Sequence, residues 1–146
     1  MDQELLKKLH SLAQLDRDAV SVYSEALPHV TDSEVKEKFT IFANQHQHHV
    51  EELSGAIERA SGSAPALNVD AMGMVADWIV SFRSMLGEKG PLHAMHMAET
   101  YHNSRYKEAV GWDVGDADLA SLLQTFYTEE QHHLSFIDDR LAVKSS

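Results

Sequence analysis

Cysteine is absent from the sequence, and this excludes disulfides, thiolate metal sites, iron–sulfur ligation and thiol nucleophiles. Basic residues are scarce, because 12 lysines and arginines stand against 23 aspartates and glutamates, for a formal net charge of −11. An acidic chain without a basic patch does not favour nucleic acid, whereas cations are natural ligands for it.

Long apolar runs are missing as well. The longest, AMGMVADWIV (71–80), is interrupted by Asp77 and is too short to span a membrane. The first ten residues, MDQELLKKLH, contain no apolar core of signal-peptide length. From these absences we expect a cytoplasmic protein that binds neither membrane nor nucleic acid.

The chain has only three prolines and seven glycines, and they cluster between long segments with a 3.6-residue apolar period. This pattern predicts an all-α protein with a single domain over residues 1–146. The pattern TDSE (31–34) is typical of a capping box, with Thr31 as the cap. The predicted long helices cover residues 2–29, 32–60, 91–111 and 116–142, and a shorter one covers 69–86.

Each of the last three long helices has polar residues in the middle of its apolar stripe. In steps of three and four, the stripe of 32–60 contains His46 and His49, and that of 116–142 contains Glu130 and His133. The stripe of 91–111 contains Glu99, His102 and Tyr106, and Tyr106 is the tyrosine best placed to hydrogen-bond a ligand. Buried acids and imidazoles need partners or a metal ion. His48 and His132 lie off these stripes and are predicted to face away from the core.

The polar residues are predicted to lie at a common depth, roughly 21–24 Å from the nearest turn at 1.5 Å per residue. On the first helix, the carboxylate at this level is Asp18, which we predict as a ligand. Glu25 lies about seven residues nearer the turn, and the sequence leaves open whether it joins the site. The predicted metal ligands are Asp18, His46, His49, Glu99, His102, Glu130 and His133.

These residues resemble those of the ferritin-like four-helix-bundle superfamily, and the whole chain is similar to a small uncharacterised bacterial ferritin-like family. EQHH (130–133) matches the Glu-x-x-His motif of the last helix, and Glu99 in AETYH matches the lone glutamate of the third. The resemblance implies a ferritin-like bundle, with the short helix in the crossover between the second and third long helices. It also implies a di-iron or di-manganese site.

The second helix departs from that motif, because His46 stands where the superfamily has a glutamate. A nitrogen-rich site suits iron(II), zinc, copper or nickel better than magnesium or calcium. We therefore expect one or two divalent transition-metal ions, with iron and zinc as the leading candidates.

Three functions stay open at this point. The first is a metal-binding protein that handles metal in stress or oxidises iron(II) as a ferroxidase-like oxidoreductase. The second is a non-enzymatic scaffold or stress protein with a metal-free buried polar network. The third is a hydrolytic zinc enzyme. A homodimer is compatible with each of them.

Overall fold

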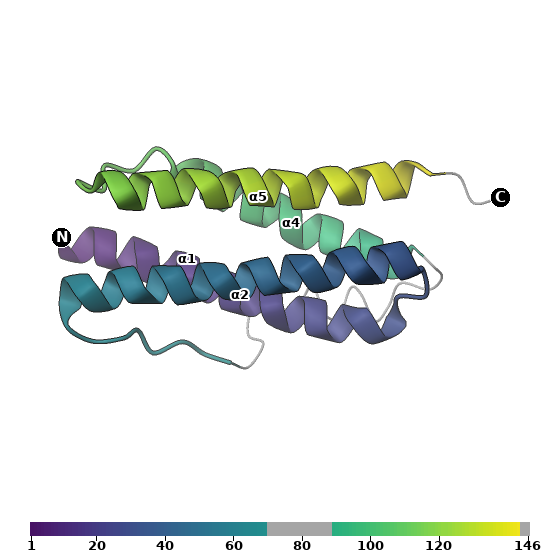
Figure 1. Ribbon diagram of the computed structural model, residues 1–146, viewed down its shortest axis with the longest axis horizontal. Helices are drawn as coiled ribbons and strands as arrows, with labels where there is room; N and C mark the ends of the chain where they lie inside the picture. The colour runs from purple at the N-terminus through teal and green to yellow at the C-terminus, as the bar shows by residue number, and fades with distance from the viewer. Residues whose placement is uncertain (70–88, 144–146) are drawn as a thin grey trace.

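The computed structural model describes residues 1–69 and 89–143, which form four long helices, a short 3₁₀ turn and no strand (Figure 1). None of the helices in this part of the chain is long and apolar enough to cross a membrane. The four long helices agree with the predicted ones, with small shifts at their ends. The predicted short helix at 69–86 lies outside the described residues, apart from Val69. The elements are α1 (Gln3–Ala26), η1 (Leu27–His29), α2 (Ser33–Ser61), α4 (Gly90–Ala109) and α5 (Ala117–Ala142).

Aspartate side chains begin three of the helices. Asp2, Asp32 and Asp116 each accept hydrogen bonds from backbone N–H groups of the first turn that follows, groups that have no partner within the helix. The predicted cap at Thr31 is wrong by one residue, since Asp32 takes that position. Gly62 caps the end of α2, and its φ of 85° is in the left-handed region that favours glycine.

The four helices lie side by side as two antiparallel hairpins, α1 with α2 and α4 with α5, whose turns are at opposite ends of the bundle (Figure 1). After α2, the chain runs back along α1. There, Gln14 exchanges hydrogen bonds with Asn68 of 2.9 and 3.0 Å, and the His10 ring lies 3.0 Å from the carbonyl oxygen of Ala66. The second hairpin starts at the end of the bundle where the first one turns (Figure 1).

The apolar core has two parts, one on each side of a polar layer. One part gathers Leu9, Leu53 and Phe126 with their neighbours, and the other gathers Phe39, Met95 and Ile137 with theirs. Between them, every long helix contributes buried polar residues. The predicted common depth is confirmed for the residues of the last three long helices. The buried polar residues are Asp16, His46, His49, Glu99, His102, Glu130 and His133.

Candidate metal centre

Six of the seven predicted ligands lie in this polar layer, and each is 0–1% exposed. They are His46, His49, Glu99, His102, Glu130 and His133. The neighbouring histidines His48 and His132 are exposed, as their positions off the stripes predicted. Periodicity thus separated the inward imidazoles from the outward ones, although their role as ligands stays a prediction.

On the first helix the structure places Asp16 in the layer, and Asp18, the residue predicted as a ligand, lies outside it. The two residues are 200° apart around a helix, so they cannot share a face. Asp18 is only half-buried and accepts a hydrogen bond of 2.8 Å from Gln14 on the same helix. Glu25 is also half-buried, and it is not part of either group of candidate donors among the described residues.

Asp16 joins the first hairpin to the second on one side of the layer. Its Oδ1 atom lies 2.7 Å from Nδ1 of His46 and 3.1 Å from Nδ1 of His49. Its Oδ2 atom accepts a hydrogen bond from the hydroxyl of Tyr106, the tyrosine that the sequence favoured for such a contact. The carboxylate is therefore held from both hairpins at once.

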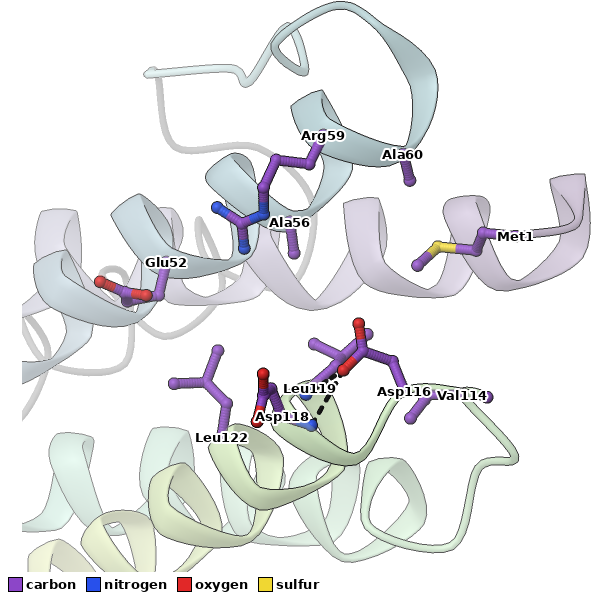
Figure 2. Close-up of a pocket in the computed structure, with 11 residues that line it drawn as sticks. Met1, Glu52, Ala56, Arg59, Ala60, Val114, Asp116, Asp118, Leu119 and Leu122 are labelled. Carbon is purple, nitrogen blue, oxygen red and sulfur yellow. Dashed lines mark hydrogen bonds between the residues drawn. The ribbon is translucent and has the colours of Figure 1, made fainter.

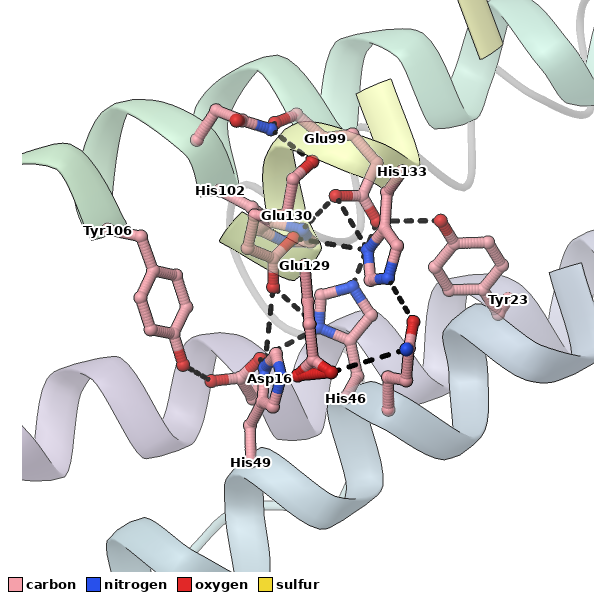
Figure 3. Close-up of polar contacts among 12 residues, drawn as sticks. Asp16, Tyr23, His46, His49, Glu99, His102, Tyr106, Glu129, Glu130 and His133 are labelled. Atoms are coloured by element: carbon pink, nitrogen blue, oxygen red, sulfur yellow. Dashed lines mark hydrogen bonds and ion pairs between the residues drawn. The ribbon is translucent and has the colours of Figure 1, made fainter. Parts of the chain in front are cut away.

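Glu99 occupies the other side of the layer. Its Oε1 atom accepts a 2.6 Å hydrogen bond from the hydroxyl of Tyr23 and lies 2.9 Å from Nε2 of His46. Its Oε2 atom is 3.5 Å from Nδ1 of His133 and 3.6 Å from Nδ1 of His102. Tyr23 and Tyr106 thus flank the layer on opposite sides, as Figure 3 shows.

Glu130 lies between the two sides and is fully buried. Neither of its oxygens accepts a hydrogen bond from the described residues. Its nearest ring nitrogens are Nδ1 of His46 and of His133 at 3.3 Å, and Nδ1 of His49 at 3.5 Å. These are ion-pair distances without hydrogen-bond geometry, so either protonated imidazoles or a metal ion can balance the charge of this buried carboxylate.

The donor atoms form two groups of four within which all the atoms lie within 4.8 Å of one another. Both groups contain His46 and Glu130. Each offers two imidazoles and two carboxylates, a donor set that suits a divalent transition metal. The first group adds Asp16 and His49, and the second adds Glu99 and His133.

The charges in the layer shift the pKa values of His46, His49 and Asp16. Burial opposes the protonated form of His46, but the carboxylates of Glu130, Glu99 and Asp16 raise its pKa to about 10. Burial also opposes protonation of His49, and contact with Asp16 raises its pKa to about 12. Conversely, burial would raise the pKa of Asp16, but the His49 charge and the imidazole hydrogen bonds hold it below the ordinary value. Without metal, positive rings therefore compensate the buried carboxylates.

A pair of residues that was not predicted from the sequence contacts the outer face of the layer. Glu129 is 24% exposed, and its Oε1 atom lies 2.8 Å from Nε2 of His49. Its Oε2 atom accepts a 3.2 Å hydrogen bond from Gln45, whose own oxygen lies 2.6 Å from Nε2 of His133. The pair thus holds the outward nitrogens of two histidines whose Nδ1 atoms face the carboxylates.

Replacing Glu129 by alanine is expected to weaken zinc binding about 10- to 100-fold, because partners of ligand imidazoles orient them and raise their basicity. Zinc affinity should be measured by competition with a chromophoric chelator. Glu51→Ala is the matched control, since Glu51 also accepts a hydrogen bond from a glutamine of α2, Gln47, but on the exposed surface. Equal affinities for both variants would contradict a role of Glu129 in the centre.

A separate hollow of about 760 Å³ opens at one end of the bundle, between the end of α2 and the start of α5 (Figure 2). Its walls are partly apolar, with Ala56, Leu119 and Leu122, and Asp116 at its rim is engaged in capping α5. The hollow shares no residue with the polar layer, so it does not supply a substrate pocket for the candidate centre.

The fold and the buried layer define a helical protein with a candidate carboxylate–histidine metal centre. The chain belongs to the DUF2383 family, a domain of unknown function, whose model matches residues 4–112. No curated protein matches the sequence. The solved structure of "YcfI, a putative structural protein from Rhodopseudomonas palustris" has the same fold. It is 16% identical, with a TM-score of 0.79, over 99% of this chain and 96% of that one.

Proposed function

We propose that this protein is a ferritin-like metal-binding protein whose mid-bundle centre holds a divalent transition metal, with iron and zinc as the leading candidates. The observation that supports this most strongly is Glu130, a fully buried carboxylate with no hydrogen bond from the described residues, at the junction of two four-donor groups. The Glu130-x-x-His133 pair and the lone Glu99 support the ferritin-like assignment. Metal handling is the function that these donors serve.

The test is the metal content of the protein. After purification without chelator, or after reconstitution with iron(II) or zinc under anaerobic conditions, elemental analysis should find about one equivalent of metal or more per chain. Less than about 0.2 equivalents of any transition metal after both treatments would overturn the proposal.

The second candidate is a metal-free scaffold, and the layer itself gives it some support. The imidazoles of His46 and His49 lie 2.7–3.1 Å from carboxylate oxygens, so protonated rings can satisfy much of the buried charge. The similar protein YcfI is itself described as "a putative structural protein". A polar layer of this kind would fix the register of the helices. It leaves the two oxygens of Glu130 with ion pairs of 3.3–3.5 Å to ring nitrogens and no hydrogen bond from the described residues, and we therefore favour metal binding.

A further inference from the structure

The two donor groups share Glu130 and His46, and these two side chains differ in how many metal ions they can bind at once. Glu130 presents one oxygen to each side, since Oε1 faces His49 and Oε2 faces His133. A carboxylate can bind one ion through each oxygen, but a neutral imidazole has a single lone pair and carries a proton on its other nitrogen. Glu130 can therefore serve both groups at once, whereas His46 can serve only one.

The surroundings of His46 favour a proton on whichever nitrogen binds no metal. Its Nδ1 atom faces Asp16 at 2.7 Å, and its Nε2 atom faces Glu99 at 2.9 Å. An ion on the Asp16 side leaves an Nε2–H that donates to Glu99, and an ion on the Glu99 side leaves an Nδ1–H that donates to Asp16. Ions on both sides would require a ring without protons and would remove both of these hydrogen bonds.

We propose that the centre binds one metal ion per chain at high affinity, because His46 can complete only one of the two groups at a time. This inference rests on the proposed function. A second ion would have only three donors, Glu99, Glu130 and His133 on one side, or Asp16, His49 and Glu130 on the other. We expect its affinity to be at least about 100-fold lower, since even the loss of an outer partner of a ligand typically costs 10- to 100-fold.

A single metal ion per chain also limits the redox chemistry of the centre. Oxidation of one iron(II) ion to iron(III) releases one electron, whereas reduction of dioxygen to peroxide consumes two. A chain with one ion cannot supply both electrons from its own centre. Paired oxidation of two iron(II) ions within one chain is therefore not expected.

The experiment counts zinc ions per chain by native mass spectrometry, with affinities from chelator competition. The wild-type protein should bind one zinc tightly. His46→Glu replaces the single lone pair by two oxygens and should raise the count to two. His48→Glu is the matched control, because it introduces the same charge two residues away at an exposed position and should leave the count at one. Circular dichroism verifies that the variants stay helical.

The outcomes separate this inference from the proposed function. A wild-type protein that binds neither zinc nor iron(II) overturns both. Two zinc ions of similar affinity in the wild-type protein overturn only the one-ion inference, and that measurement needs no variant. A folded His46→Glu variant that still binds a single zinc overturns the role assigned to His46.

Discussion

Replacing His46 and His49 together by leucine is expected to remove most of the stabilisation that zinc gives to the wild-type protein. His46 belongs to both donor groups and His49 to one, so the double variant leaves neither group with more than three donors. A ligand that binds only the folded state stabilises it by about 4 kcal/mol at 1,000 times its dissociation constant. The measurement is the melting temperature with excess zinc and with chelator. The two values should differ by several degrees in the wild-type protein and by much less in this variant.

The matched control is the double variant His48→Leu and His132→Leu. It also removes two imidazoles, but both are exposed and outside the polar layer. Its zinc-induced shift should equal that of the wild-type protein. If the scaffold candidate is correct, zinc stabilises neither the wild-type protein nor any variant. A zinc-induced shift in the His46, His49 double variant as large as that of the wild-type protein would place the metal elsewhere in the chain.

The melting temperature of the same variant in chelator measures how much the two imidazoles stabilise the buried carboxylate of Asp16. Leucine removes both imidazole partners of this buried carboxylate. Among the described residues, the Tyr106 hydroxyl is then its remaining hydrogen-bond partner. Removing the partners of a buried charge typically costs about 3–5 kcal/mol. The variant should therefore melt below the wild-type protein even without zinc.

Periodicity alone could predict most of the layer, because each inward polar residue continues an apolar stripe. His46 and His49 follow Phe39 and Phe42 in steps of three and four, and the apolar stripe resumes at Leu53. A helix that buries such a stripe has no freedom to turn these residues outward. Helix ends were predictable for a similar reason, since the few glycines and prolines of the chain fall mostly between the helices.

Asp18 was predicted in place of Asp16 because the prediction relied on the level of each residue along the helix more than on the direction of its side chain. Asp18 matches the level of His46 by counting residues from the turn, but Asp16 is only about 3 Å away along the axis and lies on the inward face. The stripe Leu9, Leu12, Asp16 follows steps of three and four, and that signal was present in the sequence.

Glu129 and Gln45 are different, because their role depends on how closely two helices approach. Glu129 is adjacent to Glu130 and therefore points about 100° away from it around α5. Its contact with His49 arises only because α2 packs beside α5 at this level, with 80 residues between the two positions. A single sequence contains no signal for this distance, so only the structure shows the pair.

Raising the pH from 6.5 to 9.5 is expected to destabilise the metal-free protein while it strengthens zinc binding. The pKa of His46 is 6.5 in its ordinary state and about 10 in the folded protein, owing to Glu130, Glu99 and Asp16. Its contribution to stability is therefore complete below pH 6.5 and is lost as the pH rises toward 10. The pKa of His49 is raised in the same direction, to about 12.

The sign is opposite for Asp16, whose pKa is lowered, so its contribution is present above its ordinary value of 3.8 and is lost as the pH falls below it. The metal-free protein should thus be most stable between these limits, at roughly pH 5 to 6.5. Above that range, the free energy of unfolding should fall by about 1 kcal/mol per pH unit for each imidazole that stays protonated. Urea unfolding at several pH values, in the presence of chelator, measures this slope.

Zinc must replace protons on these same imidazoles, so its binding releases protons and its affinity rises with pH. The zinc-induced increase in melting temperature should therefore be larger at pH 8.5 than at pH 6.5. His46→Gln should reduce both slopes, while His48→Gln, at an exposed position, should reduce neither. If the stability of the metal-free protein were level between pH 6.5 and 9.5, the buried rings would be neutral throughout. In that case the carboxylates of the layer would have no imidazolium partners in the metal-free protein. This result would contradict the raised pKa values of His46 and His49, and it would not depend on the outcome of the zinc measurements.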